Sequence, residues 1–185
     1  ALVFKAYATM ALTDLYGDVP YSEALKGQEG ITSPAYDTQQ DIYQKENGIV
    51  ALLQQAVVVM EAYNGAIKLQ GDIIYNGNLQ KWIKLANSLQ LKALMRISNV
   101  VDVKQALNSL SNQPLITSAD DNAFYNFTQG PPNNFRMSTA KVGDYNLFMM
   151  SATIDSILTT LNDPRKTKYF RPTAADANVY RGLLN

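Results

Sequence analysis

Apolar residues recur at helical spacing in several separate segments of the chain. Between about 39 and 63, apolar side chains return every three or four residues, which places them on one face of a helix. Between about 79 and 101 the spacing is the same, with Trp82 on the apolar face and lysines on the opposite one. Residues 1–16 are apolar nearly all round, which predicts burial among other helices. Further helices are expected near 103–110 and 151–161. The pattern therefore predicts an all-α fold with little or no β-structure.

Glycine, proline and capping residues set the expected helix boundaries. Gly17 and Pro20 end the first helix. Thr38 and Asp41 approximate a capping box at the start of the second. Gly48 lies inside this expected helix, at a cost of about 1 kcal/mol relative to alanine. Either a neighbouring backbone approaches this glycine closely, or the helix tolerates a weak position.

The intervening and C-terminal segments carry no helical period. Residues 18–37 are expected to form a loop, and 119–144 a long irregular stretch. Residues 123–127 are the one candidate for a short strand, and the tail from 166 to 185 is expected to be irregular. No repeat at the 34-residue spacing of tetratricopeptide repeats is found, although the helical-hairpin layout is similar in kind.

Composition narrows the function classes. The 185 residues include 16 basic and 16 acidic side chains, so the net charge is zero and a nucleic-acid-binding role is not expected. The chain contains no histidine and no cysteine, which removes Ser-His-Asp and thiol catalysis and His- or Cys-ligated metal sites. Unbroken apolar stretches such as Ala56–Met60 are far shorter than the ~20 residues of a membrane helix. Carboxylate-based catalysis remains open.

Four segments, in this order along the chain, resemble the SusD/RagB-like family of outer-membrane nutrient-binding lipoproteins, in particular its SusD-like branch. The first ends the first helix and reads TDLYGDVPYSEA, and the second, PAYDTQQDIY, opens the next helix. The third reads GDIIYNGN and continues as WIKLANSL, and the fourth consists of DPR, YF and YRG near the end. These segments are residues 13–24, 34–43, 71–89 and 163–182.

The resemblance implies a fold and a role. Members of this family are built from tetratricopeptide-like helical hairpins, with long irregular loops that carry the ligand site. The resemblance further implies a lipoprotein on the outer membrane at the cell surface, which delivers oligosaccharides or peptides to a SusC-like TonB-dependent transporter. The family's lipidated cysteine and signal peptide are not in this chain. We therefore expect one SusD-like domain over 1–185, incomplete at both ends, with a helical scaffold at 1–118 and a loop-rich, ligand- or partner-facing region at 119–185.

The loop Gly130–Arg136 is the strongest candidate for ligand binding. Loops on a rigid helical scaffold commonly carry function, and aromatic faces combined with amide and guanidinium donors suit polyhydroxylated ligands. An ordinary exposed loop, or a surface that contacts the transporter, explains the same composition. The candidate ligand-binding residues are Tyr125, Phe127, Asn133, Asn134, Phe135, Arg136 and Tyr145.

Other conspicuous residues favour structural roles. Trp82 is the only tryptophan, but its place on the apolar face indicates a core position rather than a sugar platform. Arg96 lies near the same face, so it either extends to water or pairs with Asp14 or Asp18. The Asp120–Asn122 segment favours turn hydrogen bonds over a calcium site or an acid–base pair. No catalytic residue, metal site or cofactor is expected.

Two rival functions remain at this point. A glycoside hydrolase would need two carboxylates about 5–10 Å apart, and the sequence nominates no such pair. A helical protein-interaction scaffold without a small-molecule ligand would show the same helical pattern. We therefore expect a binding protein and not an enzyme.

Overall fold

The computed structural model describes residues 1–65, 70–135, 149–173 and 175–182. Its internal contacts divide the chain into two compact units, Ala1–Asn126 and Phe127–Asn185. The first unit holds the helical core, and the described part of the smaller second unit contains two short helices.

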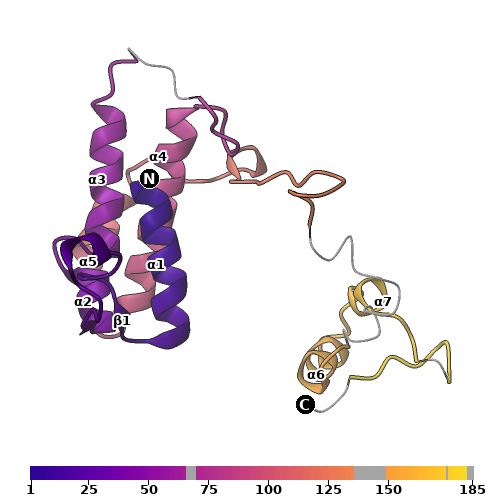
Figure 1. Ribbon diagram of the computed structural model, residues 1–185. Helices are drawn as coiled ribbons and strands as arrows, with labels where there is room; N and C mark the ends of the chain where they lie inside the picture. Colours follow the sequence, from indigo (N-terminus) through magenta and orange to yellow (C-terminus); the bar gives the residue numbers. More distant parts are fainter. Residues whose placement is uncertain (66–69, 136–148, 174, 183–185) are drawn as a thin grey trace. The chain divides into compact units, whose positions relative to one another are not determined.

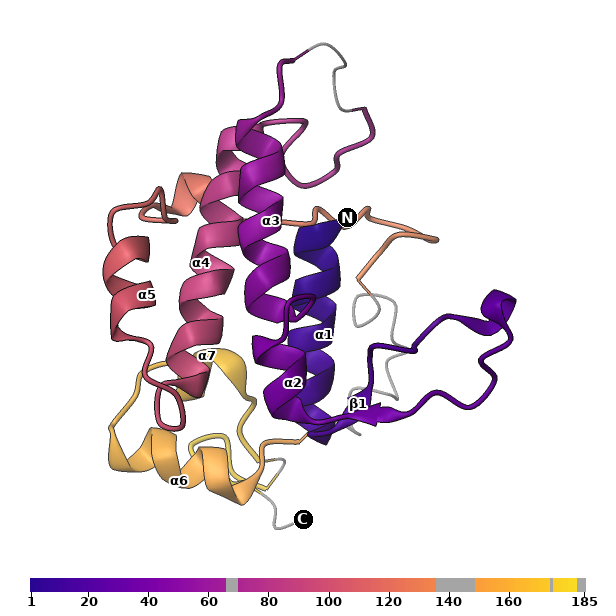
Figure 2. The same cartoon turned by 90° about the vertical axis from the view of Figure 1, so that its left-hand side faces the viewer.

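Three long helices form the centre of the first unit. The helices α1 (Leu2–Tyr16), α3 (Ile49–Glu61) and α4 (Leu79–Ile97) run side by side, and α3 contacts both of the others (Figure 1; Figure 2). The shorter α2 (Gln39–Gln44) packs against α1 and α3, and α5 (Lys104–Leu110) packs against α4. The arrangement confirms the predicted mostly helical, hairpin-based fold.

The helix α4 shows how the sequence pattern becomes structure. Asn78 caps its first turn by accepting a hydrogen bond from Lys81 N at 3.1 Å. Trp82 lies on its buried face with 8% of its surface exposed, as predicted, and Leu89 lies on the same face with 9% exposed. Met60 of α3 is only partly buried against this core.

The predicted single helix over 39–63 is wrong, because the chain breaks between α2 and α3. The last hydrogen bond of α2 runs from Lys45 N to Asp41 O. Gly48 N then donates to Lys45 O in a tight turn. A Cβ at Gly48 would lie 2.7 Å from Ile42 O and 2.9 Å from Lys45 O. Of the two interpretations of this glycine, close backbone approach is the correct one. The capping interaction of Thr38 with Asp41 N is confirmed at 3.1 Å.

The loop predicted over 18–37 contains a two-stranded ladder. The strands β1 (Val19–Pro20) and β2 (Tyr36–Asp37) pair antiparallel, and the 3₁₀ turn η1 (Gly27–Glu29) lies between them. Asp37 accepts hydrogen bonds from the backbone N–H groups of Tyr21 and Ser22, which fixes the ladder to the segment that follows β1. The candidate strand at 123–127 is not a strand in the structure.

The second unit is organised around Asp155. The helix α6 (Ala152–Thr160) begins at the cap Ser151, and α7 (Lys166–Tyr169) packs against it. The Lys166 ammonium lies 2.6 Å from Asp155 Oδ1, and Gly182 N donates to Asp155 Oδ2 at 2.7 Å. The single turn of α7 corrects the expectation of an irregular tail, since a four-residue helix is too short to show a hydrophobic period.

Candidate ligand-binding loop

Backbone hydrogen bonds close the loop that the sequence analysis singled out. Thr128 N donates to Asn133 O at 3.0 Å, and the Thr128 hydroxyl donates to Gly130 O at 2.6 Å. Thr128 and Asn134 also form an isolated parallel bridge. The segment from Phe127 to Phe135 is therefore a closed turn in which both ends carry a phenylalanine.

The two phenylalanines at the ends of this turn lie against each other. The ring centroids of Phe127 and Phe135 are 5.4 Å apart, with an angle of 58° between the ring planes. The two side chains remain 53% and 51% exposed. Because each ring keeps about half of its surface in contact with water, the pair offers apolar area to a ligand without opening the core.

Two asparagines lie beside the ring pair. Asn133 is exposed, while Asn134 is half-buried and donates from Nδ2 to the Phe135 carbonyl at 3.2 Å. Side-chain amides both donate and accept hydrogen bonds, so they match hydroxyl groups of either polarity. The structure thus brings four of the predicted residues together: Phe127, Asn133, Asn134 and Phe135.

Of the other three predicted ligand-binding residues, the structure describes only Tyr125, which is not part of this closed turn. Tyr125 is 40% exposed and belongs to the first unit, whereas the loop belongs to the second. Arg136 and Tyr145 lie outside the described residues.

Trp82 is held in the core by its surroundings. Its indole Nε1 donates to Asp72 Oδ2 at 2.7 Å, and its ring meets Phe4 and Tyr75 edge-on, with centroids 5.3 Å away in both cases. Partial burial pushes the pKa of the Asp72 carboxyl up, but hydrogen bonds from Trp82 and three backbone N–H groups lower it overall. The prediction that Trp82 is a core residue is confirmed.

The Asp120–Asn122 segment is a structural turn, as favoured from the sequence. It overlaps the 3₁₀ turn η2 (Ala119–Asp121), where Tyr75 donates its hydroxyl proton to Asp121 O at 2.7 Å. The Lys84 ammonium, 2.8 Å from Asp121 Oδ2, lowers the pKa of that carboxyl. Across the described ranges, no cluster of three or more acidic side chains is arranged to hold a metal ion.

Arg96 forms an ion pair, which selects one of the two interpretations of this residue. Its NH1 lies 3.1 Å from Asp14 Oδ2, and the Tyr43 hydroxyl donates to the other carboxylate oxygen at 2.7 Å. Burial, followed by the hydrogen bond to Asp14 and the charge of Asp14, raises the pKa of Tyr43 far above its usual value. The tyrosine therefore stays protonated and remains a donor to Asp14.

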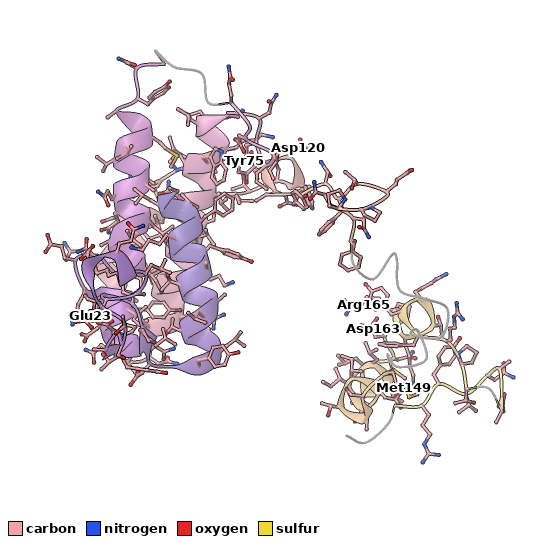
Figure 3. All side chains as sticks on the ribbon, viewed as in Figure 1. Glu23, Tyr75, Asp120, Met149, Asp163 and Arg165 are labelled. Carbon is pink, nitrogen blue, oxygen red and sulfur yellow. The ribbon has the colours of Figure 1, made fainter. Side chains whose placement is uncertain are left out.

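The Asp163–Arg165 pair follows the end of α6 and stabilises the turn there. Arg165 donates from its side chain to both carboxylate oxygens of Asp163, with the closest contact at 2.5 Å (Figure 3). These hydrogen bonds lower the pKa of Asp163 to about 2. The pair therefore stabilises the turn locally.

Comparison with known proteins identifies the family. The sequence profile of a SusD-like family, described as "Starch-binding associating with outer membrane", matches residues 1–183. The chain belongs to the SusD-like family. This is a family of binding proteins rather than enzymes. No curated protein matches the sequence.

Solved structures of SusD homologues resemble the chain over nearly its full length. A SusD homologue from Bacteroides vulgatus is 30% identical with a TM-score of 0.75, and the match covers 100% of this chain and 37% of that one. A SusD homologue from Bacteroides fragilis is 26% identical with a TM-score of 0.73, covering 98% and 40%. A structure described as a chitin-binding protein is 31% identical with a TM-score of 0.68, covering 89% and 34%. The chain thus spans roughly a third to two fifths of these structures.

No helix among the described residues is both long enough and apolar enough to cross a membrane. The SusD-like family is associated with the outer membrane, as its description states.

Two residues without a predicted role shape these regions. Thr128 closes the candidate loop with its N–H and hydroxyl groups. Asp72 accepts hydrogen bonds from four donors around Trp82. The signal for Asp72 was present, since an aspartate before a glycine-punctuated turn commonly accepts backbone hydrogen bonds.

Proposed function

We propose that this chain is part of a cell-surface nutrient-binding protein that captures oligosaccharides and delivers them to a SusC-like TonB-dependent transporter. The observation that carries the proposal is the SusD-like profile, which matches residues 1–183. A starch-binding description of the family and a chitin-binding relative favour a glycan as the ligand, with peptides as the alternative cargo. In this role the protein would be a lipoprotein of the outer membrane.

The proposal assigns different tasks to the two regions of one SusD-like domain. Residues 1–118 form the helical scaffold, and α3 and α4 pack against each other at the centre of its core. Residues 119–185 carry the loops that face the ligand or the transporter. Of the residues predicted to bind the ligand, Phe127, Asn133, Asn134 and Phe135 lie in the closed turn and form the proposed site.

The geometry of the closed turn supports sugar binding within this site. A sugar ring has one apolar face of C–H groups and a rim of hydroxyls. The half-exposed Phe127–Phe135 pair covers the apolar face, and the neighbouring amides of Asn133 and Asn134 satisfy the rim. Affinity from a shallow site of this kind is modest, which suits a protein that must release its cargo.

Substitution of the ring pair tests the site. Phe135→Ala and Phe127→Ala should each weaken glycan binding about tenfold, because truncation removes stacking area worth about 0.5–1.5 kcal/mol beyond simple burial. Phe124→Ala is the matched control, since Phe124 is 60% exposed and lies in the first unit, outside the closed turn. Titration calorimetry gives the affinity, and co-purification with the SusC-like barrel reports assembly.

The outcomes separate a ligand loop from a transporter contact. Lost glycan binding with intact co-purification supports the ligand site. Lost co-purification with intact glycan binding assigns the turn to the transporter instead. If both survive in both phenylalanine variants, the closed turn is a plain exposed loop and the assignment is wrong.

A further inference from the structure

A polar hollow lies in the first unit, where the C-terminal ends of α1 and α4 meet α2. It has a volume of about 570 Å³, within the ~300–1,000 Å³ typical of small-molecule sites. Its lining includes Asp14, Arg96, Gln40 and Gln44. We call it the Arg96 hollow.

The guanidinium group of Arg96 is held in place from one side. The two Asp14 carboxylate oxygens are occupied by Arg96 NH1 and by the Tyr43 hydroxyl, at 3.1 and 2.7 Å. Tyr43 is itself buried, so it fixes the carboxylate from the core side. Arginine carries five N–H donors, and the Arg96 side chain is 47% exposed. Asp14 therefore fixes the orientation of the guanidinium group, and the N–H donors that do not face Asp14 remain accessible to a ligand.

Two glutamines present amide groups to the same hollow. Gln40 and Gln44 are four residues apart on α2, so their side chains lie on one face of the helix. Both are exposed, and within the described residues neither side chain has a hydrogen-bond partner. The neighbouring Gln39 donates to Thr13 O at 2.7 Å, which orients the third amide of the group.

Charge and apolar surface define the class of ligand. Among the described residues of the lining, Asp14 and Arg96 alone carry formal charges, and these cancel, so the lining favours neither an anion nor a cation. Ile97, Val100 and Val101 add an apolar wall on the α4 side. An apolar wall with a rim of amide and guanidinium groups matches a neutral ligand with one C–H face and several hydroxyls.

We propose that the Arg96 hollow is a second glycan subsite, which binds one or two neutral sugar rings. The inference rests on the proposed glycan-binding function and adds a site on the first unit, whereas the Phe127–Phe135 turn belongs to the second. Arg96 and the glutamines contact the sugar hydroxyls, while Asp14 and Tyr43 are positioning residues that act through Arg96.

The test uses variants that leave the Asp14–Tyr43 pair intact. The double variant Gln40→Ala/Gln44→Ala removes both amides, and Arg96→Lys keeps the positive charge opposite Asp14 but removes the planar fork. Gln55→Ala is the matched control, because Gln55 is exposed on α3 and outside the hollow. Thermal unfolding of each variant confirms that the fold is kept.

The experiment measures affinity by calorimetry for the neutral glycan that binds most strongly on a glycan array, and in parallel for a mixture of short peptides. Loss of two hydrogen bonds should weaken glycan binding about tenfold in the double glutamine variant. Arg96→Lys should weaken it to a similar extent, and Gln55→Ala should not change it.

Each other result overturns the inference in a recognisable way. If a glycan binds and only the phenylalanine variants weaken it, the hollow is not a subsite, and the proposed function stands. If the glutamine variants weaken peptide binding but not glycan binding, the ligand class is wrong. If the unsubstituted protein binds no glycan on the array, the proposed function and the subsite fail together.

Discussion

The indole Nε1 of Trp82 donates a 2.7 Å hydrogen bond to Asp72 Oδ2, which ties the first turn of α4 to the segment that precedes it. The same carboxylate accepts backbone hydrogen bonds from Ile74, Tyr75 and Gly77, at 2.9–3.1 Å. One aspartate thus organises a turn and orients the largest aromatic side chain of the core. The only tryptophan of the chain is a structural residue for this reason.

Truncation of Trp82 should destabilise the first unit strongly. Trp82→Ala removes a buried ring and one partner of Asp72, so the free energy of unfolding should fall by about 3–5 kcal/mol. Trp82→Phe keeps most of the ring but loses the hydrogen bond, and should cost about 1–3 kcal/mol. Chemical denaturation measures both. Unchanged stability of Trp82→Ala together with lost glycan binding would place Trp82 in a ligand site instead.

The positions of the main helices were predictable because periodic burial is a local property of the sequence. The break at Gly48 was not, because the apolar period continues across it in phase. The glycine alone signalled two possibilities, tolerance or close approach. Only the backbone path shows that Ile42 O and Lys45 O occupy the space that a Cβ would need.

Gly48→Ala should therefore lower stability, although alanine is the better helix former. The added Cβ would meet two carbonyl oxygens at 2.7 and 2.9 Å, so the turn between α2 and α3 must shift. The control is Gly27→Ala, where nothing lies within 4 Å of the new Cβ and the backbone is not in the left-handed region. Thermal unfolding should show a clear loss for Gly48→Ala and little change for Gly27→Ala. A stabilised Gly48→Ala variant would indicate a continuous helix over 39–63.

Acid should destabilise the fold through carboxyl groups whose pKa is lowered. Arg165 lowers the pKa of Asp163 to about 2, and the donors around Asp72 lower its pKa as well. Both values lie below the ~3.9 of an unfolded aspartate, so the unfolded chain binds protons first as the pH falls. The stabilising contribution is complete above about pH 4 and is lost as the pH falls toward 2.

Unfolding midpoints measured between pH 5 and pH 2 test this dependence. The midpoint should fall steadily below about pH 4, and Asp163→Asn should flatten part of the decline because the substituted side chain cannot titrate. An Asp163→Asn variant that repeats the pH profile of the parent would show that this carboxyl carries none of the effect.

The residue types of the candidate site were predictable from the sequence, but their arrangement in space was not. Aromatic and amide residues around Gly130 indicated a binding loop, and four of them meet in the closed turn. Thr128 closes this turn through a hydrogen bond, and a single hydrogen bond produces no periodic pattern in the sequence that could predict it. The partners of Asp121 were hidden for a related reason, since Lys84 lies 37 residues away along the chain.

Capture without cleavage is the central claim, and one measurement tests it most directly. The protein is titrated with the glycan selected on an array, and the recovered ligand is analysed by mass spectrometry after prolonged incubation. The account predicts saturable binding and an intact ligand. Cleavage products that disappear when a single aspartate or glutamate is substituted would contradict it, as would the absence of binding to any glycan.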